Sequence, residues 1–118
     1  MYEVTVKTGF SAAHQLRHYE GKYENLHGHN WTAIVTVEAK ELDKIGVGID
    51  FVVLKKKVDE ILRQLDYKNI NEVPPFDAQN PSAENIARWL FKELSGQVNG
   101  DNACVKRVEI KEFDDCGA

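Results

Sequence analysis

Two stretches with alternating polar and apolar side chains place the strongest constraint on the fold of this chain. Residues 2–10 alternate between two faces, with Tyr2, Val4 and Val6 on one face and charged or hydroxyl residues on the other. Residues 30–39 repeat the pattern and are rich in aromatic and β-branched residues. A period of two residues is that of a half-buried β-strand. The sequence therefore predicts two strands.

Two later stretches have the period of amphipathic helices. The apolar residues of the first, over residues 51–65, are Phe51, Leu54, Val58, Ile61, Leu62 and Leu65. Asp50 precedes this helix and has the chemistry of an N-cap. A second helix is predicted to open at Pro81, Ser82 and Glu84 and to end near Gly96, with apolar residues at Ile86, Leu90 and Leu94.

The predicted order is strand, strand, helix, helix, strand, because residues 104–113 alternate again. This order predicts an α+β fold in which an antiparallel sheet has both helices on one face. The 118 residues contain no Pro/Gly/Ser-rich linker and no internal repeat, so we expect a single domain over residues 1–118. Because a domain of this size leaves sheet edges exposed, we expect it to associate with further copies.

The composition excludes several classes of partner. A net charge of −4 and a pI near 5.5 argue against nucleic acid, which is bound through a basic face. Charges interrupt every apolar stretch of the first ten residues, so we expect no signal peptide, no membrane partner and a cytoplasmic location. Cys104 and Cys116 lack CxxC spacing and are expected to be reduced thiols.

The tripeptide His27-Gly28-His29 is the first candidate for chemistry. On an extended backbone the two imidazoles point to the same face, about 7 Å apart at Cα, so they can converge on one ion. Catalytic zinc typically takes three protein ligands and keeps a fourth position open. An HxH pair also arises by chance among surface or core histidines, so spacing alone does not decide for a metal.

A third ligand is expected from residues 11–26, which we predict to be a long polar loop between the first two strands. His14 is the natural candidate, because the end of the neighbouring strand would bring it across. His18 lies in the same loop, and spacing does not separate the two.

Six motifs in order along nearly the whole chain resemble the 6-pyruvoyl-tetrahydropterin synthase family. They are FSAAH (10–14), ENLHGHN (24–30), GIDFxxLK (48–55), LDYKNIN (65–71), NPSAEN (80–85) and VEIKE (108–112). That family includes the 6-carboxy-tetrahydropterin synthases of queuosine biosynthesis. The resemblance implies the T-fold, in which ββααββ units form a trimeric barrel and pair into hexamers with pockets between subunits.

The resemblance implies that His14, His27 and His29 are zinc ligands, which settles the choice against His18. It also implies that Glu112 anchors the pterin, because a carboxylate can accept two parallel hydrogen bonds from the 2-amino and N3 groups. Without the resemblance, Glu112 would be interpreted as a solvated glutamate at a strand end.

Ser82 stands where the family usually has a threonine beside the pterin. A serine at this position could equally cap the second helix. The resemblance therefore implies a substrate-binding role, and the local pattern offers a structural one.

The chain departs from the family near the HGH motif. Tyr23 occupies the position, four residues before His27, where most members have a cysteine, and Glu24 follows it. The resulting ExxHGH pattern resembles the folate-pathway branch, which converts 7,8-dihydroneopterin triphosphate to 6-hydroxymethyl-7,8-dihydropterin. In that chemistry Glu24 would act as general base and then acid. A solvated loop glutamate is the structural alternative.

A second departure concerns the proton relay, where Asp66 is followed by Tyr67 instead of the usual histidine. We expect Asp66 to be catalytic, acting with Tyr67 or a water molecule. The chain also stops at residues 116–118, so a final fourth strand of the sheet is expected to be short.

The leading hypothesis is a zinc-dependent lyase that cleaves the side chain of 7,8-dihydroneopterin triphosphate for folate synthesis. The nearest rival is a 6-carboxy- or 6-pyruvoyl-tetrahydropterin synthase. A non-catalytic zinc- and pterin-binding relative and a generic metallohydrolase are weaker alternatives. Arg17, Lys22, Lys106 and Arg107 are equal candidates for holding the triphosphate, and the sequence does not choose among them.

Overall fold

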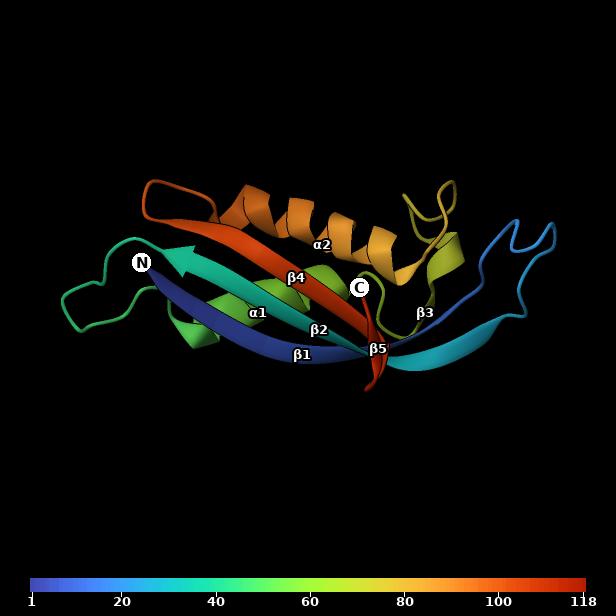
Figure 1. Cartoon of the computed structure of the whole chain (residues 1–118), viewed down its shortest axis with the longest axis horizontal. Coiled ribbons are helices and arrows are strands. Elements are labelled where there is room, and N and C mark those ends of the chain that lie inside the picture. The colour runs from blue at the N-terminus through green and yellow to red at the C-terminus, as the bar shows by residue number, and fades with distance from the viewer.

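The computed structural model describes residues 1–118 as an elongated body of 54 × 23 × 22 Å. Its elements are β1 (Tyr2–His14), β2 (His27–Ala39), α1 (Phe51–Leu62), β3 (Lys68–Asn69), the 3-10 turn η1 (Ile70–Glu72), α2 (Ala83–Val98), β4 (Ala103–Phe113) and β5 (Cys116–Gly117). The long loop between β1 and β2 projects from one end, and the N-terminus and the β2–α1 loop lie at the other (Figure 1). Neither α-helix has the length and apolar composition that a bilayer span requires.

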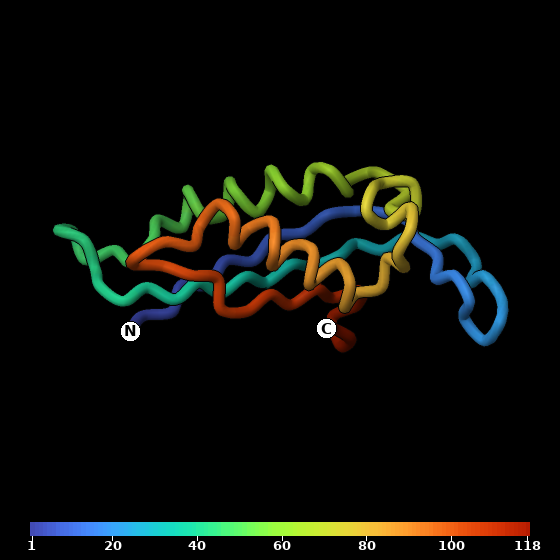
Figure 2. Tube along the Cα trace, turned by 90° about the horizontal axis from the view of Figure 1, so that it is seen from above, coloured from blue at the N-terminus to red at the C-terminus, as the bar shows by residue number.

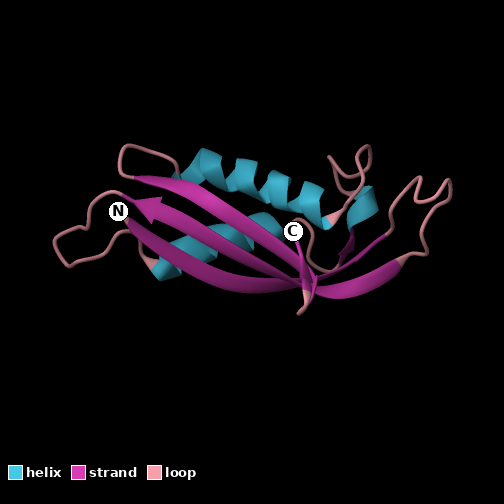
Figure 3. Ribbon diagram, viewed as in Figure 1, coloured by secondary structure: helices cyan, strands magenta, loops and turns pink.

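The sheet has the strand order β3-β1-β2-β4-β5. All neighbours are antiparallel except β3, which pairs with β1 in parallel at Ala12 and Ala13. The two helices run along the sheet in contact with each other (Figures 2 and 3). The predicted α+β class and antiparallel pairing are confirmed, and β3 adds one short parallel strand. The last strand, β5, is as short as expected, with two residues.

The boundaries around the histidines differ from the predicted ones. β1 continues to His14 and β2 begins at His27, so the predictions of a loop over residues 11–26 and of a strand start at residue 30 were wrong. The loop itself spans only residues 15–26. Histidines in a strand break the apolar pattern although the backbone still alternates, and this hid the extension.

The helices begin as predicted and end differently. Asp50 caps α1 by accepting a hydrogen bond from the Val52 amide at 2.7 Å, and Ser82 caps α2 by accepting one from the Asn85 amide at 3.1 Å. α1 stops three residues before Leu65, because the chain turns there into β3. α2 continues past Gly96 to Val98.

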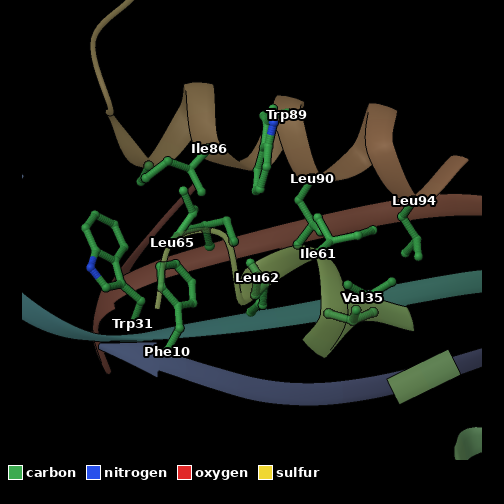
Figure 4. Packing of buried hydrophobic residues seen from close by; sticks show 14 of the residues in the cluster. Phe10, Trp31, Val35, Ile61, Leu62, Leu65, Ile86, Trp89, Leu90 and Leu94 are labelled. Atoms are coloured by element: carbon green, nitrogen blue, oxygen red, sulfur yellow. The ribbon is translucent and has the colours of Figure 1, made fainter. Parts of the chain in front are cut away.

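One apolar core fills the space between the sheet and both helices (Figure 4). Its fully buried members include Trp31, Val35, Leu54, Leu62, Leu65, Phe76, Ile86, Leu90, Leu94 and Ile110. Phe10 of β1 stacks on Trp31 of β2 with ring centroids 5.7 Å apart. The core therefore extends along the sheet up to the end at which the histidines lie.

A β-bulge at Lys106 keeps β4 in phase with this core. The register shifts between Thr36 and Val37 of β2, which leaves Lys106 as the extra residue of β4. Val105 and Ile110 are five positions apart and would point to opposite faces of a regular strand. Because of the bulge, both are buried. The bulge directs Lys106 outward, where its ammonium contacts Glu3 at 2.8 Å and Glu38 at 2.9 Å.

Candidate metal centre and active site

The three histidines continue the core-facing rows of β1 and β2. On β1, His14 lies two residues after the buried Ala12. On β2, His29 lies two residues and His27 four residues before the buried Trp31. The antiparallel register pairs His14 with His27 and Ala12 with His29. Directly paired side chains on one face have Cβ atoms about 5 Å apart, so the backbone itself brings the imidazoles together.

Backbone carbonyls fix the tautomers of two of these rings. Nδ1 of His14 donates to the Pro81 carbonyl at 2.7 Å, and Nδ1 of His27 donates to the Asn25 carbonyl at 2.7 Å. With the proton on Nδ1, each Nε2 presents a lone pair. One potential ligand atom from each of the three histidines lies within 4.8 Å of the other two.

The site has the donor set that a divalent transition metal needs. Nε2 of His14 and Nε2 of His29 are buried and have no hydrogen-bond partner. A buried nitrogen without a partner is costly, and a metal ion would satisfy both atoms. Burial lowers the pKa of His29, and the nearby Glu112 carboxylate partly opposes this shift. A lowered pKa keeps the ring neutral, which is the form that binds a metal.

Two aromatic rings flank the triad, the buried Trp31 and the exposed Phe113. Trp31 lies edge-on to His14, with centroids 4.7 Å apart, and to His29 at 5.1 Å, and Phe113 lies edge-on to His29 at 5.0 Å. The indole nitrogen of Trp31 donates to the Ala12 carbonyl at 3.1 Å. Sequence reasoning missed both aromatic residues. The even spacing of Trp31 from the HGH tripeptide was the available signal.

Glu112 reaches the triad from β4. It lies two residues beyond the buried Ile110, so its side chain points to the core face. One carboxylate oxygen is 3.8 Å from Nε2 of His14 and the other is 3.7 Å from Nε2 of His29. Both distances exceed that of a hydrogen bond, and the side chain is about one-third exposed. Glu112 thus borders the metal centre with its oxygens open to a ligand.

Glu24 lies beside His27 at the other side of the triad. Its carboxylate accepts a hydrogen bond from the Leu16 amide at 3.3 Å and is 3.9 Å from Nδ1 of His27. It therefore lies on the Nδ1 side of the His27 ring. The structure brings Glu24 next to a predicted ligand and gives it a backbone partner.

Asp66 is not brought to the histidines of its own chain. Its carboxylate accepts the Ser11 amide hydrogen at 2.9 Å at the outer edge of β1, and it has no ion-pair contact with any histidine. Tyr67 follows with a positive φ of 57° and a side chain that is 86% exposed. These two residues form a separate group beside the sheet edge.

Ser82 and His18 have clear places outside the triad. Ser82 is the N-cap of α2 and adjoins Pro81, whose carbonyl orients His14. His18 has a φ of 62° in the β1–β2 loop, and its ring packs edge-on to Tyr23. Spacing in the sequence left the choice between His14 and His18 open. The geometry favours His14, which lies with His27 and His29.

Two of the four basic candidates for phosphate binding are already engaged within the chain. The Arg17 guanidinium donates to the carbonyls of Gln79, Asn71 and Phe76. Lys106 binds two carboxylates on the sheet face away from the helices. Neither is free to hold a triphosphate in this conformation.

Comparison with known proteins agrees with this geometry. A family model described as 6-pyruvoyl tetrahydropterin synthase matches residues 3–118. A Pyrococcus furiosus protein named dihydroneopterin monophosphate aldolase is 35% identical over 114 residues, which are 97% of this chain and 92% of that protein. A Synechocystis protein named 6-carboxy-5,6,7,8-tetrahydropterin synthase is 35% identical over 99 residues, which are 80% of this chain and 75% of that protein.

Comparison of the fold with solved structures points to the same family. The structure of Caenorhabditis elegans 6-pyruvoyl tetrahydropterin synthase superposes with a TM-score of 0.81 at 26% identity, covering 100% of this chain and 94% of that one. The expected T-fold is confirmed by this match. The chain belongs to the 6-pyruvoyl tetrahydropterin synthase family.

Proposed function

We propose that this enzyme is a zinc-dependent pterin lyase that cleaves the C1′–C2′ bond in the side chain of a phosphorylated 7,8-dihydroneopterin. The product is 6-hydroxymethyl-7,8-dihydropterin, a precursor for folate-type cofactors. The observation that most supports this reaction is the Glu24 carboxylate, 3.9 Å from Nδ1 of His27 and one residue after the position at which most of the family has a cysteine. The 35% identity with a protein named dihydroneopterin monophosphate aldolase supports the same bond cleavage.

The three histidines would hold the zinc ion through their converging ring nitrogens. When bound, the ion supplies Lewis acidity, which lowers the pKa of the substrate's side-chain hydroxyls. His14 and His27 are oriented for this by the Pro81 and Asn25 carbonyls.

Glu24 moves the proton in the proposed reaction. It takes the proton of the 2′-hydroxyl, the C2′–O bond becomes a carbonyl, and the C1′–C2′ bond breaks. The electron pair of that bond enters the conjugated dihydropterin ring, and Glu24 returns the proton to C1′. The second product is a phosphorylated glycolaldehyde, so atoms and electrons balance without an oxidant.

Glu112 positions the pterin ring. Its oxygens lie 3.7 and 3.8 Å from the ring nitrogens of His29 and His14, so a pterin held by this carboxylate is bound in the same site as the histidines. Two parallel hydrogen bonds to a carboxylate fix both the position and the plane of the ring. Ser82 supports this arrangement from the N-terminus of α2, next to the segment that orients His14.

We also propose that the working form is a homo-oligomer, a trimer or a hexamer. β1 has an outer partner only at Ala12 and Ala13, and β4 has one only near its C-terminal end, so most of both sheet edges has no partner strand. Exposed edges of this length favour pairing between copies. Asp66 and Tyr67 lie at the β1 edge, and such pairing would place them near the histidines of a neighbouring copy.

The rival function is 6-carboxy-tetrahydropterin synthesis, which the Synechocystis relative favours. Against it, the free thiols Cys104 and Cys116 lie on β4 and β5, and no cysteine is near Glu24 in the sequence. The Asp115 carboxylate raises the pKa of Cys116, so this thiol is a poorer nucleophile at neutral pH. A carboxylate base suits bond cleavage without covalent participation of a thiol.

The test is product identification by mass spectrometry. Zinc-loaded protein is incubated separately with the triphosphate and the monophosphate of 7,8-dihydroneopterin, which also assigns the number of phosphates accepted. The expected main product is 6-hydroxymethyl-7,8-dihydropterin. A 6-carboxy or 6-pyruvoyl pterin as main product would overturn the proposal. Pterin binding without turnover would instead identify a non-catalytic relative.

The oligomer is tested separately by light scattering and by mixing inactive variants. If Asp66 acts on the histidines of a neighbouring copy, mixed oligomers of His14→Ala and Asp66→Ala chains regain activity, because some of their sites contain both intact residues. A monomer at micromolar concentration, or no recovery after mixing, would contradict the shared site.

A further inference from the structure

The segment that follows β1 joins the metal ligand His14 to the proposed base Glu24. Glu24 pairs with Leu16 twice: its backbone amide donates to the Leu16 carbonyl at 2.9 Å, and its carboxylate accepts the Leu16 amide hydrogen at 3.3 Å. The position of the Glu24 carboxylate therefore depends on where the backbone of Leu16 is held.

Two asparagine side chains hold the residues on either side of Leu16. The Asn71 side chain accepts the Gln15 amide hydrogen at 2.8 Å and donates to the Gln15 carbonyl at 2.9 Å. Asn80 makes the same pair of bonds with Arg17, at 2.8 and 2.9 Å. Each asparagine side chain bonds both the amide and the carbonyl of one residue, as a neighbouring strand would do. Residues 15–17 are therefore anchored although they lie beyond the end of β1.

Further bonds connect the backbone on which the two asparagines stand. The Arg17 guanidinium donates to the Asn71 carbonyl at 3.3 Å and to the Phe76 carbonyl at 2.8 Å. The Asn85 side chain donates to the Asn80 carbonyl at 2.9 Å. The residue after Asn80 is Pro81, whose carbonyl orients His14. One connected segment thus contacts both the ligand strand and the loop that leads to the base.

We propose that Asn71 and Asn80 are positioning residues that set the Glu24 carboxylate against the metal centre through Leu16. This inference rests on the proposed catalytic role of Glu24. Placement of a general base within a few tenths of an ångström affects the chemical step far more than substrate binding. Loss of either asparagine should therefore lower kcat and leave the affinity for pterin unchanged.

The chain contains a matched control at its opposite end. Asn102 makes the same two bonds with one residue, accepting the Glu41 amide hydrogen at 2.9 Å and donating to the Glu41 carbonyl at 3.0 Å. This asparagine supports the β2–α1 loop, far from the histidines along the sheet (Figure 1). Asn102→Ala removes the same number and kind of hydrogen bonds without touching the site.

The experiment compares Asn71→Ala, Asn80→Ala and Asn102→Ala as zinc-loaded proteins. The first readout is amide hydrogen exchange at Leu16 and Glu24. We expect exchange about tenfold faster in Asn71→Ala and Asn80→Ala, as the loss of two backbone-anchoring bonds implies, and no change in Asn102→Ala. Unchanged exchange at both amides in Asn71→Ala and Asn80→Ala would overturn the inference.

The second readout is the kinetic effect in two backgrounds. In the wild-type background, Asn80→Ala should lower kcat about tenfold or more, whereas Asn102→Ala should not. In the Glu24→Ala background, Asn80→Ala should cause no further loss, because both changes remove the same function. Additive losses, or a loss of zinc affinity with normal exchange at Glu24, would assign Asn80 a merely structural role.

The two proposals fail in different ways. If the wild-type protein forms a different pterin, the assigned reaction is wrong, but hydrogen exchange still decides whether the asparagines hold Glu24. If the assigned product forms and exchange at Glu24 does not change, only the positioning role is wrong.

Discussion

His14 on β1 and His27 on β2 are direct cross-strand partners, and their ring centroids lie 4.8 Å apart. His29, two residues along β2, completes the group with centroids 5.2 Å from His14 and 4.7 Å from His27. The candidate ligand set therefore depends on the register of two long strands. A shift by one residue would turn the histidines to the opposite face.

Replacing His14 by alanine should abolish stoichiometric zinc binding, because two imidazoles leave the ion without its third protein ligand. We expect a loss of affinity above about a hundredfold, larger than the effect of removing an outer partner of a ligand. Competition with a chromogenic chelator measures it. His18→Ala is the control, since His18 lies four residues after His14, in the β1–β2 loop and outside the triad. Equal zinc affinity in His14→Ala and wild type would remove His14 from the ligand set.

The metal-free protein should lose stability in mild acid through His29. Burial lowers the pKa of His29 below its ordinary value of 6.5, so the unfolded chain binds this proton more tightly than the folded one. The free energy of unfolding should therefore fall as the pH decreases below about 6.5, until the folded-state pKa is passed. Urea titrations of metal-free wild type and His29→Gln between pH 5 and 7.5 measure it. An unchanged pH dependence in His29→Gln would contradict this assignment.

Replacing Glu112 by glutamine should weaken pterin binding and leave the zinc content intact. The variant keeps the shape of the side chain but loses the charge and one acceptor, which corresponds to about a 10- to 100-fold loss of affinity. Pterin fluorescence titration and elemental analysis measure the two effects. Glu109→Gln, three positions earlier on the same strand, is the control. Loss of zinc together with pterin would make Glu112 part of the metal site instead.

Replacing Glu24 by alanine should lower kcat about 10²- to 10⁴-fold, the usual contribution of a general base, while pterin affinity stays near that of the wild type. Single-turnover kinetics and pterin titration separate the two quantities. Glu20→Ala, in the same loop, should be neutral. An active Glu24→Ala variant would leave the reaction without its proposed base.

The alternation of residues 2–10 and 30–39 was enough to predict two strands, and the helical spacing of residues 51–65 predicted most of α1. The strand extensions to His14 and from His27 were not visible in the sequence, because a pattern of apolar residues ends where polar histidines replace them. The parallel strand β3 has two residues, too few to leave a period in the sequence.

The candidate site was also predicted only in part from the sequence. HxH spacing predicted that His27 and His29 share a face, and cross-strand pairing places His14 beside them. Sequence did not predict that Asp66 would lie at the β1 edge, because position at an edge depends on the strand order. The bonds of Asn71 and Asn80 were equally invisible, since an asparagine in a connection has no periodic neighbours.

All three candidate metal ligands stand on one pair of hydrogen-bonded strands, while the proposed base stands on the loop that joins these strands. Changes at positions 23 and 24 of this loop can therefore alter the chemistry without disturbing the three histidines. A fold arranged in this way can diversify its reactions by small genetic steps and keep the ion as an inherited constant.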